Sequence, residues 1–215
     1  MFAFVKTSHV PFAATTGISA PLDLSRWVGK EGWTRLPKAI QRRFAVGHAD
    51  TAYLGQMDLR CSVVGHLFAA LAHLLGGPLT HMNMTNVPTR VRVSANEHGG
   101  VVWERSFHPE GQQQARIVRS TKEADADGSL LEHTDGGLSM SLDVYEENGS
   151  LVFCSRRFCL AWGRFRLPIP AWLTPGTCRV SHTDLGDGQF RFSLSMVHPL
   201  WGETFHQTGV FVDPS

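Results

Sequence analysis

Charged side chains that share a strand face with large apolar residues are the first candidates for chemistry. Arg105 has the strand phase of Trp103 and Phe107, because residues two apart on a strand point to the same side of the sheet. If the two aromatic side chains face the interior, the guanidinium faces it as well. A guanidinium in an apolar cavity is suited to holding a carboxylate or phosphate head group. The pattern therefore predicts that Arg105, Trp103 and Phe107 belong to a ligand-binding site.

Two further charged residues follow the same pattern. Arg119 has the phase of Ile117, and Glu132 lies two positions after Leu130 on its predicted strand. A buried charge is unfavourable unless it is paired and hydrogen-bonded, so a structural interpretation stands beside the functional one. In that interpretation Arg105 pairs with Glu132 and fixes the sheet register, or its stem runs along the apolar surface to the rim. In the functional interpretation, Arg119 and Glu132 join the predicted binding site.

Aromatic residues are numerous enough to line a cavity. The chain has thirteen Phe and six Trp, and Phe153, Phe192 and Met196 lie on predicted strands with an inward phase. The expected ligand is a small amphipathic or anionic molecule enclosed by the sheet. A cavity larger than about 300 Å³, the usual lower limit for ligand pockets, distinguishes such a site from a filled core.

Signature motifs of known catalytic sites are not found. The chain has no G-x-S-x-G elbow, P-loop, G-x-G-x-x-G or H-E-x-x-H motif. An enzyme built on this chain would take its acid or base from Glu132, His133 or His198, because the pKa values of these residue types can be tuned towards neutrality. His198 and His206 alone are too few ligands for a metal site. We therefore expect no metal and no cofactor, and we assign no catalytic residue.

The charge balance limits the classes of partner that we expect, and the cysteines indicate the compartment. The 215 residues include 20 Lys and Arg against 19 Asp and Glu, a formal net charge of +1. Nucleic-acid and membrane-surface binders usually carry a strong basic excess, so neither partner is expected. The cysteines, Cys61, Cys154, Cys159 and Cys178, form no C-x-x-C pair. Free thiols, together with an amino terminus that does not resemble a signal peptide, indicate the cytoplasm.

The elements that must position these residues begin with an arm and a short helix. Residues 1–34 carry prolines and glycines with little periodicity, which predicts an irregular arm. A helix is expected to begin at Leu36-Pro37 and to end near Gly47, because Leu36, Ile40 and Phe44 recur every four residues.

A second helix is predicted over residues 63–75. Seven of its apolar side chains fall within an arc of about 140°, which predicts that this arc packs against a sheet. His66 and His73 lie outside the arc and are expected to be more exposed. Gly76 and Gly77 provide a stop.

From residue 87 onwards the apolar period changes from helical to alternating. Eight or nine strands follow one another with short turns and no intervening helices, which predicts antiparallel pairing. Such a meander curls into a barrel or half-barrel and so removes its edges. We therefore predict one mostly β, α+β domain over residues 35–215, with helices within 36–78 and an antiparallel sheet over 87–212.

A proline-rich stretch interrupts the strands between residues 167 and 175. Pro168, Pro170 and Pro175 cannot donate to a strand ladder. We expect a loop or short helix over one end of the barrel, with Trp172 and Leu173 as its apolar plug.

Several of these segments carry a resemblance to a known family. In order along the chain they are Leu36-Pro37 with its short helix, Trp103-Glu104-Arg105-Ser106-Phe107, Gly136-Gly137-Leu138, the Leu167–Pro175 loop, Phe190-Arg191-Phe192, His198-Pro199-Leu200-Trp201-Gly202 and Thr208-Gly209. The chain resembles the bacterial family called domain of unknown function 4166, over roughly residues 36 to 212. Members resemble standalone proteins or carboxy-terminal appendages of saccharopine-dehydrogenase-like oxidoreductases, which implies a dehydrogenase-like partner. Relatives often have tyrosine near Gln207-Thr208, so no role for a tyrosine is carried over.

Three functions stay open on these observations. The first is a binding module for a small amphipathic or anionic ligand. The second is an enzyme, or an accessory domain that acts with a dehydrogenase-like partner protein. The third is a structural or interaction domain with a filled core.

Overall fold

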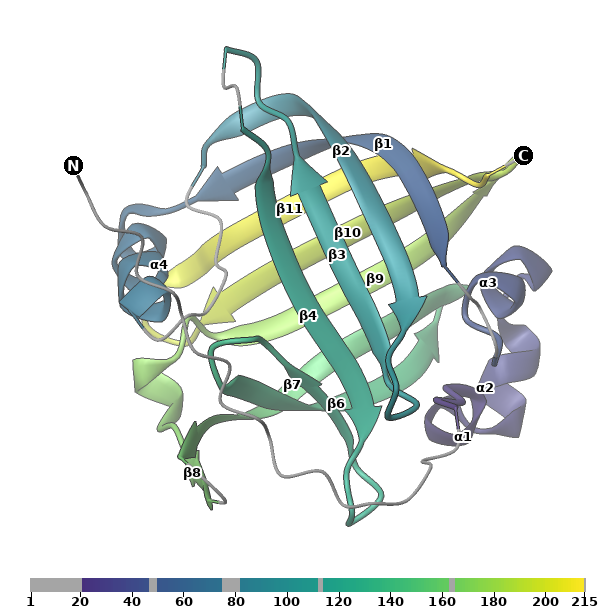
Figure 1. Ribbon diagram of the computed structural model, residues 1–215, viewed down its shortest axis with the longest axis horizontal. Coiled ribbons are helices and arrows are strands. Elements are labelled where there is room, and N and C mark those ends of the chain that lie inside the picture. The colour runs from purple at the N-terminus through teal and green to yellow at the C-terminus, as the bar shows by residue number, and fades with distance from the viewer. Residues whose placement is uncertain (1–20, 47–49, 75–81, 112–113, 163–164, 215) are drawn as a thin grey trace.

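A closed antiparallel barrel forms the body of the protein (Figure 1). The computed structural model describes residues 21–46, 50–74, 82–111, 114–162 and 165–214. Ten strands form the ring, and β8 pairs with the end of β7 alone. The strands are β1 (Thr51–Cys61), β2 (Met84–Ala95), β3 (Val101–Phe107), β4 (Arg116–Ala124), β5 (Leu130–His133), β6 (Leu138–Glu147), β7 (Ser150–Trp162), β8 (Phe165–Pro168), β9 (Thr177–Gly186), β10 (Gln189–His198) and β11 (Gly202–Val212).

Two long-range pairings close the ring. The first and last strands pair from Leu54 opposite Val212 to Cys61 opposite Phe205, and the start of β7 pairs with β9. Closure removes the free strand edges that an open sheet would expose. The prediction of a mostly β, antiparallel barrel is confirmed, with ten strands in the ring where eight or nine were expected.

The strand that the sequence analysis missed is β1, which lies in the interval expected to hold only helices. Its inward positions include Tyr53, Gly55 and Met57, while Leu54 points outwards and is exposed. Gly55 interrupts the alternation of apolar side chains, so the sequence pattern does not indicate a strand here. A Cβ at Gly55 would come within 2.6 Å of the Phe211 ring, so the close approach of β1 and β11 requires this glycine.

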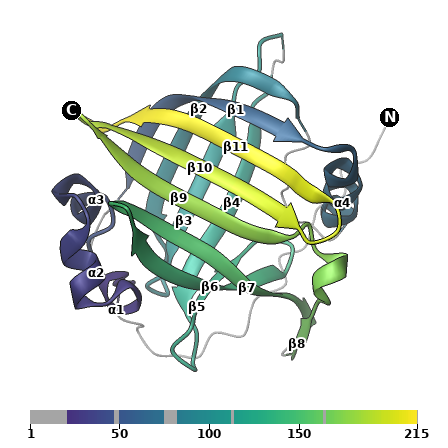
Figure 2. The same cartoon turned by 180° about the vertical axis from the view of Figure 1, so that it is seen from behind.

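Three short helices lie at one end of the barrel (Figures 1 and 2). They are α1 (Ser25–Val28), α2 (Lys30–Arg35) and α3 (Lys38–Arg43). Leu22 and Leu24, just before them, are buried in the core. The irregular arm expected over residues 1–34 is therefore wrong for residues 21–34, and residues 1–20 lie outside the described part of the chain.

The apolar face predicted around α3 faces the barrel. Leu36, Ile40 and Phe44 are all buried, although α3 itself is shorter than the predicted helix and Gly47 lies outside the described residues. The Phe44 ring stacks on Trp103 with centroids 5.7 Å apart. The segment around α3 therefore covers the interior at this end of the barrel.

The helix at the opposite end is α4 (Val63–Leu74), and its predicted apolar arc divides in two. Phe68 and Ala69 are buried against the barrel, whereas Leu67 and Leu71 are 61% and 48% exposed. The helix approaches β11 through Gly65, where a Cβ would lie 2.2 Å from the Thr204 carbonyl oxygen. The face that contacts the barrel is therefore the one that carries this glycine, and part of the predicted arc turns to solvent. His66 and His73 are exposed, as expected, and the predicted stop at Gly76 and Gly77 lies outside the described residues.

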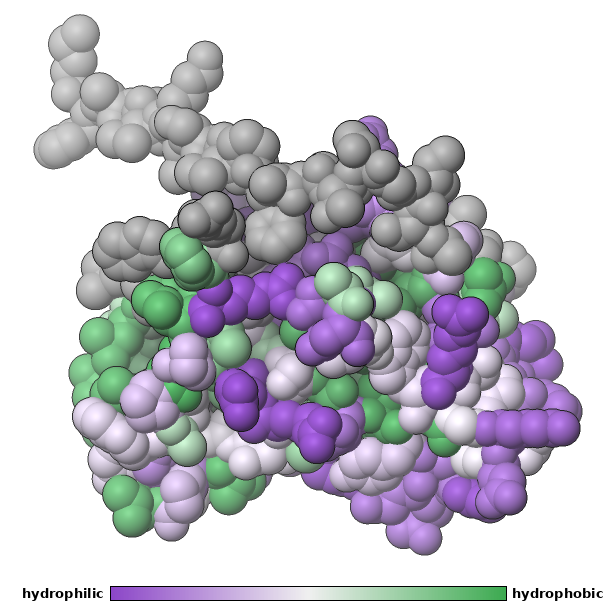
Figure 3. All heavy atoms as spheres, turned by 90° about the horizontal axis from the view of Figure 1, so that it is seen from below, coloured by the Kyte–Doolittle hydropathy of each residue, from purple (hydrophilic) through white to green (hydrophobic). Residues whose placement is uncertain are grey.

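Exposed apolar side chains gather around this same end of the molecule. The proline-rich stretch forms a short 3-10 helix, η1 (Ala171–Leu173), but Trp172 and Leu173 are 60% and 50% exposed and do not plug the barrel. Phe165 and Leu167 on β8 are also exposed. Figure 3 shows apolar surface at the end that carries β8 and hydrophilic surface towards α1, α2 and α3.

No helix within the described ranges is both long and apolar enough to cross a membrane.

Candidate functional site

Three neighbouring strands turn charged side chains into the barrel. Alternation along β3 directs Trp103 and Arg105 inwards, β4 contributes Lys122, and β5 contributes Glu132. In the β4–β5 register Lys122 lies directly opposite Glu132, whereas Arg105 lies opposite Val118 on β4. Directly opposed residues on one sheet face are the pairs that interact most closely. The register therefore makes Lys122, and not Arg105, the ion-pair partner of Glu132.

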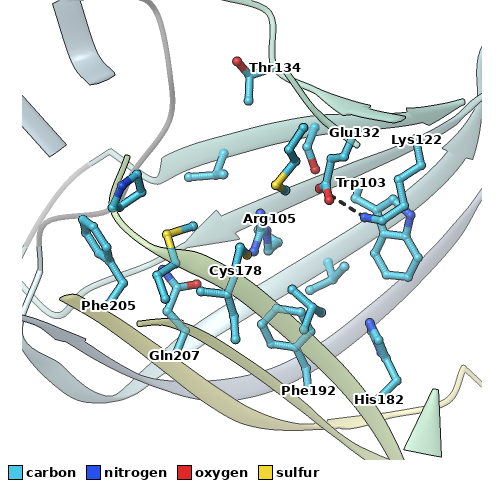
Figure 4. A pocket seen from close by; sticks show the side chains of 18 of the residues that line it. Trp103, Arg105, Lys122, Glu132, Thr134, Cys178, His182, Phe192, Phe205 and Gln207 are labelled. Atoms are coloured by element: carbon cyan, nitrogen blue, oxygen red, sulfur yellow. Dashed lines mark ion pairs between the residues drawn. The ribbon is translucent and has the colours of Figure 1, made fainter. Parts of the chain in front are cut away.

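An apolar cavity surrounds these charged groups (Figure 4). Its other wall comes from β9, β10 and β11, with Phe192, Met196 and Phe205 among its lining residues. The cavity volume is about 110 Å³. One water occupies roughly 30 Å³ in the liquid, so the space corresponds to about four waters or one small organic molecule. It is smaller than the roughly 300–1,000 Å³ of typical ligand pockets, so it does not reach the volume that the sequence analysis set as the mark of a ligand site. Any occupant of this cavity must therefore be small.

The Lys122–Glu132 ion pair is buried. Its Nζ–Oε1 distance is 3.1 Å, and each side chain is less than 10% exposed. The ammonium group also lies 5.3 Å and 5.2 Å from the ring centroids of Trp103 and Phe153, where cation–π attraction adds to the pair. Burial alone would raise the pKa of Glu132, but the charge of Lys122, together with hydrogen bonding to the carboxylate and the charge of Arg105, outweighs burial and holds that pKa below its ordinary value. Glu132 is therefore a carboxylate at neutral pH.

Arg105 has no such partner. Its Nε has no hydrogen-bond partner within the described part of the chain, and Figure 4 shows the guanidinium apart from the Lys122–Glu132 pair. The Cζ atom of Arg105 lies 5.7 Å from the centroid of the Phe192 ring. Burial lowers the pKa of Arg105, and the charge of Glu132 opposes that shift. Arg105 still stays protonated, so the cavity wall presents a cation that no carboxylate of the described residues contacts.

Two further ionisable residues line the cavity, and the sequence analysis missed both. Burial and the neighbouring cations Lys122, Arg43 and Arg105 lower the pKa of His182 to about 3, so its ring is neutral. The Nδ1 of His182 is buried and has no hydrogen-bond partner among the described residues. Burial raises the pKa of Cys178 to about 12, so it is a thiol. Alternation with Val180 on β9 places both residues on the inner face, and this pattern is visible in the sequence.

The structure places the five predicted site residues in three different environments. Trp103, Arg105 and Glu132 line the cavity. Phe107 shares their inward face but is fully buried in the core and does not reach the cavity lining. Arg119 lies on the outer face, where its guanidinium pairs with Glu104.

The outward position of Arg119 corrects the predicted phase of β4. Ile117 and Arg119 do share a face, but Ile117 is 58% exposed, and that face is the outer one. The inward residues are the alternate set of Val118, Ser120 and Lys122. A single exposed isoleucine had suggested the wrong side of the strand.

The other acid or base candidates lie away from the cavity. His133 Nε2 lies 3.1 Å from a Glu123 carboxylate oxygen on the outside of the barrel. His198 is buried at the end of β10, stacked on Trp201 with centroids 4.2 Å apart, and its Nδ1 accepts the Leu200 N–H. Neither residue is in the cavity lining, so the structure does not bring the three candidates together.

Within the residues that the structure describes, no group of three or more His, Cys, Asp or Glu side chains is arranged to hold a metal ion.

Comparisons with known proteins agree with the resemblance noted in the sequence. A family model described as Domain of unknown function (DUF4166) matches residues 36–211, most of the chain and the whole barrel apart from the last residue of β11. No curated protein matches the chain.

Proposed function

The chain belongs to this family of domains of unknown function, whose description assigns no reaction, and we propose that its barrel binds a small anionic ligand with an apolar body. The observation that carries the proposal is the guanidinium of Arg105 in an apolar cavity, where no carboxylate of the described residues contacts it and its Nε has no hydrogen-bond partner among them. Arg105 is half-buried, and a charge that faces an apolar cavity without a partner is unfavourable. An anionic head group removes that penalty through charge-assisted hydrogen bonds. The structural alternative, an Arg105–Glu132 pair, is weakened because Glu132 pairs with Lys122.

The wall opposite Arg105 supports a ligand with an apolar body. Phe192 lies against the guanidinium, and Met196 and Phe205 continue the apolar lining along β10 and β11. The cavity of about 110 Å³ suits a short or single-ring body, and a longer chain would require side chains to move. The ligand is therefore a compact amphiphile, with its head at Arg105.

Mass spectrometry of molecules that co-purify with the protein tests this proposal. We expect the wild-type protein to retain a small anionic compound that the Arg105→Met variant loses. Arg119→Met is the matched control, because Arg119 lies on the outer face and its loss leaves the cavity intact. A compound retained equally by wild type and Arg105→Met would overturn the role of Arg105. A wild-type protein that retains nothing, and that takes up no small organic anion added to it, would overturn the binding function.

We also propose a protein partner, on separate grounds. The exposed apolar residues of α4, η1 and β8 form a surface that a dehydrogenase-like partner would cover. Co-elution with a saccharopine-dehydrogenase-like protein tests this, and Leu67→Glu with Trp172→Ser should abolish it. Co-elution that survives both changes would exclude this surface.

The proposed compartment is the cytoplasm, since all four cysteines are free thiols in the structure. Detection of the protein in a periplasmic or secreted fraction would contradict this assignment.

A further inference from the structure

We infer that the ligand of the barrel cavity carries a single negative charge and that the site discriminates against dianions and neutral molecules of the same shape. This inference rests on the proposed binding function and specifies its ligand class. It follows from the charges that the cavity wall holds, counted over every ionisable residue in the lining.

Five ionisable side chains line the cavity, and they leave one positive charge in excess. Arg105 and Lys122 are cations and Glu132 is an anion, while His182 and Cys178 are neutral. Lys122 and Glu132 cancel each other at 3.1 Å. The remaining charge is that of Arg105, which no carboxylate of the described chain contacts.

The nearest charged cluster outside the lining does not change this count. Arg43 lies over the Phe190 ring, 4.5 Å from its centroid, and is paired with Asp184 and Asp213. Both carboxylates keep some exposure to water, which screens their excess negative charge. The charge that an occupant meets is therefore the one on Arg105.

A monoanion neutralises this cavity, and other charge states do not. A neutral molecule leaves Arg105 without a counter-charge, and a dianion brings a second negative charge that only the already paired Lys122 could meet. Charges in a water-poor cavity interact strongly, so this mismatch is costly in either direction.

The same count predicts how the selectivity can be changed. Glu132→Gln removes the counter-charge of Lys122 and raises the excess from one to two. The variant should then prefer a dianion. Lys122→Met combined with Glu132→Gln returns the excess to one and should restore the preference for a monoanion, which separates the effect of charge from the effect of a changed side chain.

Isothermal titration calorimetry with three ring compounds of nearly the same shape tests the inference. The probes are benzenesulfonate, a monoanion, phenylphosphonate, a dianion in mildly alkaline buffer, and benzenesulfonamide, which is neutral there. We expect wild type to bind benzenesulfonate at least about tenfold more tightly than either other probe, a difference of about 1.4 kcal/mol. Glu132→Gln should reverse the order of the two anions, and the double variant should restore it.

The outcomes separate this inference from the proposed function. If wild type binds the two anions with equal affinity, or prefers the dianion, the single-charge inference fails while anion binding stands. If none of the probes binds, both fail. If Glu132→Gln does not fold, the phosphonate titration of wild type in mildly acidic buffer decides. There the same compound is a monoanion and should bind about as tightly as benzenesulfonate, and unchanged weak binding would overturn the inference.

Discussion

Two arginines of this barrel, the buried Arg43 and the half-buried Arg105, have opposite electrostatic environments. Arg43, at the end of α3, donates from Nε and Nη2 to the two carboxylate oxygens of Asp213 at 2.6 Å and 2.7 Å, and its Nη2 also donates to Asp184 at 3.1 Å. Arg105, in the cavity, contacts no carboxylate within the part of the chain that the structure describes. Both guanidiniums lie against aromatic rings of β10, Phe190 and Phe192 respectively, so their apolar surroundings are alike.

The difference between the two arginines is the ground for giving Arg43 a structural role and for proposing a binding role for Arg105. The pairs of Arg43 attach α3 to the ends of β9 and β11 and so hold the helical end of the barrel closed. For Arg105 the described residues supply no carboxylate, and the proposed function assigns that place to an anionic ligand. Burial of a charge alone therefore says little about function, and the presence or absence of its counter-charge is what distinguishes the two roles.

The largest predicted loss of stability follows from replacing Lys122, the buried cation that pairs with Glu132. Lys122→Met leaves Glu132 without its direct partner and should lower the free energy of unfolding by about 3–5 kcal/mol. The double variant with Glu132→Gln should recover much of that loss, because no unpaired charge remains. Urea denaturation of the single and double variants measures both quantities. Additive losses would show that the two residues do not form an energetic pair.

Arg43→Met should have the next largest effect. Asp184 and Asp213 lose their counter-charge but keep some access to water, so we expect a loss of roughly 2–4 kcal/mol, below the full range for a buried pair. Arg92→Met is the matched control, because Arg92 and its partner Asp50 have side chains that are 52% and 57% exposed, so their pair lies at the surface. The control should cost less than about 1 kcal/mol. Equal losses in the two variants would remove the distinction drawn for Arg43.

A smaller effect is expected from pH, through His182. The pKa of this histidine falls from 6.5 in the unfolded chain to about 3 in the folded protein, because burial and the nearby cations disfavour its charged form. Below pH 6.5 the unfolded state binds the extra proton, so acid destabilises the fold by about 1.4 kcal/mol per pH unit until the folded pKa is reached. The depressed pKa of Glu132 leaves the Lys122–Glu132 pair intact over the upper part of this range.

Denaturation at pH 7 and pH 5 measures the contribution of His182. Wild type should lose about 2 kcal/mol more than His182→Leu between these values. His66→Gln, on the exposed face of α4, should follow wild type, because the buried imidazole remains. A His182→Leu variant as acid-sensitive as wild type would mean that His182 is not buried as a neutral ring.

Strand phase predicted part of the cavity and misplaced another part for a definite reason. On β3 and β5 the large apolar residues do face inwards, so the inward directions of Trp103, Arg105 and Glu132 followed from alternation. On β4 the apolar residue chosen to mark the inner face, Ile117, is exposed, so the inference from it selected Arg119 over Lys122. One apolar side chain does not determine a strand's inner face, because many lie on the surface of folded proteins.

Register is the property that strand phase could not supply. The Lys122–Glu132 pair follows from the β4–β5 pairing, in which the two residues are directly opposed. The sequence contains both residues but does not state which residues oppose each other across the turn. The helical end was missed for a related reason, because the buried positions of Leu22 and Leu24 depend on contacts with the barrel and not on a local period.

The most direct test of the central claim, that Arg105 is kept without a protein partner in order to meet an anionic ligand, is the stability of Arg105→Met with and without benzenesulfonate. Without ligand, we expect the variant to match wild type within about 1 kcal/mol or to exceed it, since an unpaired charge facing an apolar cavity has been replaced by an apolar side chain. At a ligand concentration about ten times the wild-type dissociation constant, wild type should gain about 1.4 kcal/mol and the variant should gain almost nothing. A variant that loses 3 kcal/mol or more (about the cost of breaking a buried ion pair), and that benzenesulfonate stabilises as much as it does wild type, would contradict the account.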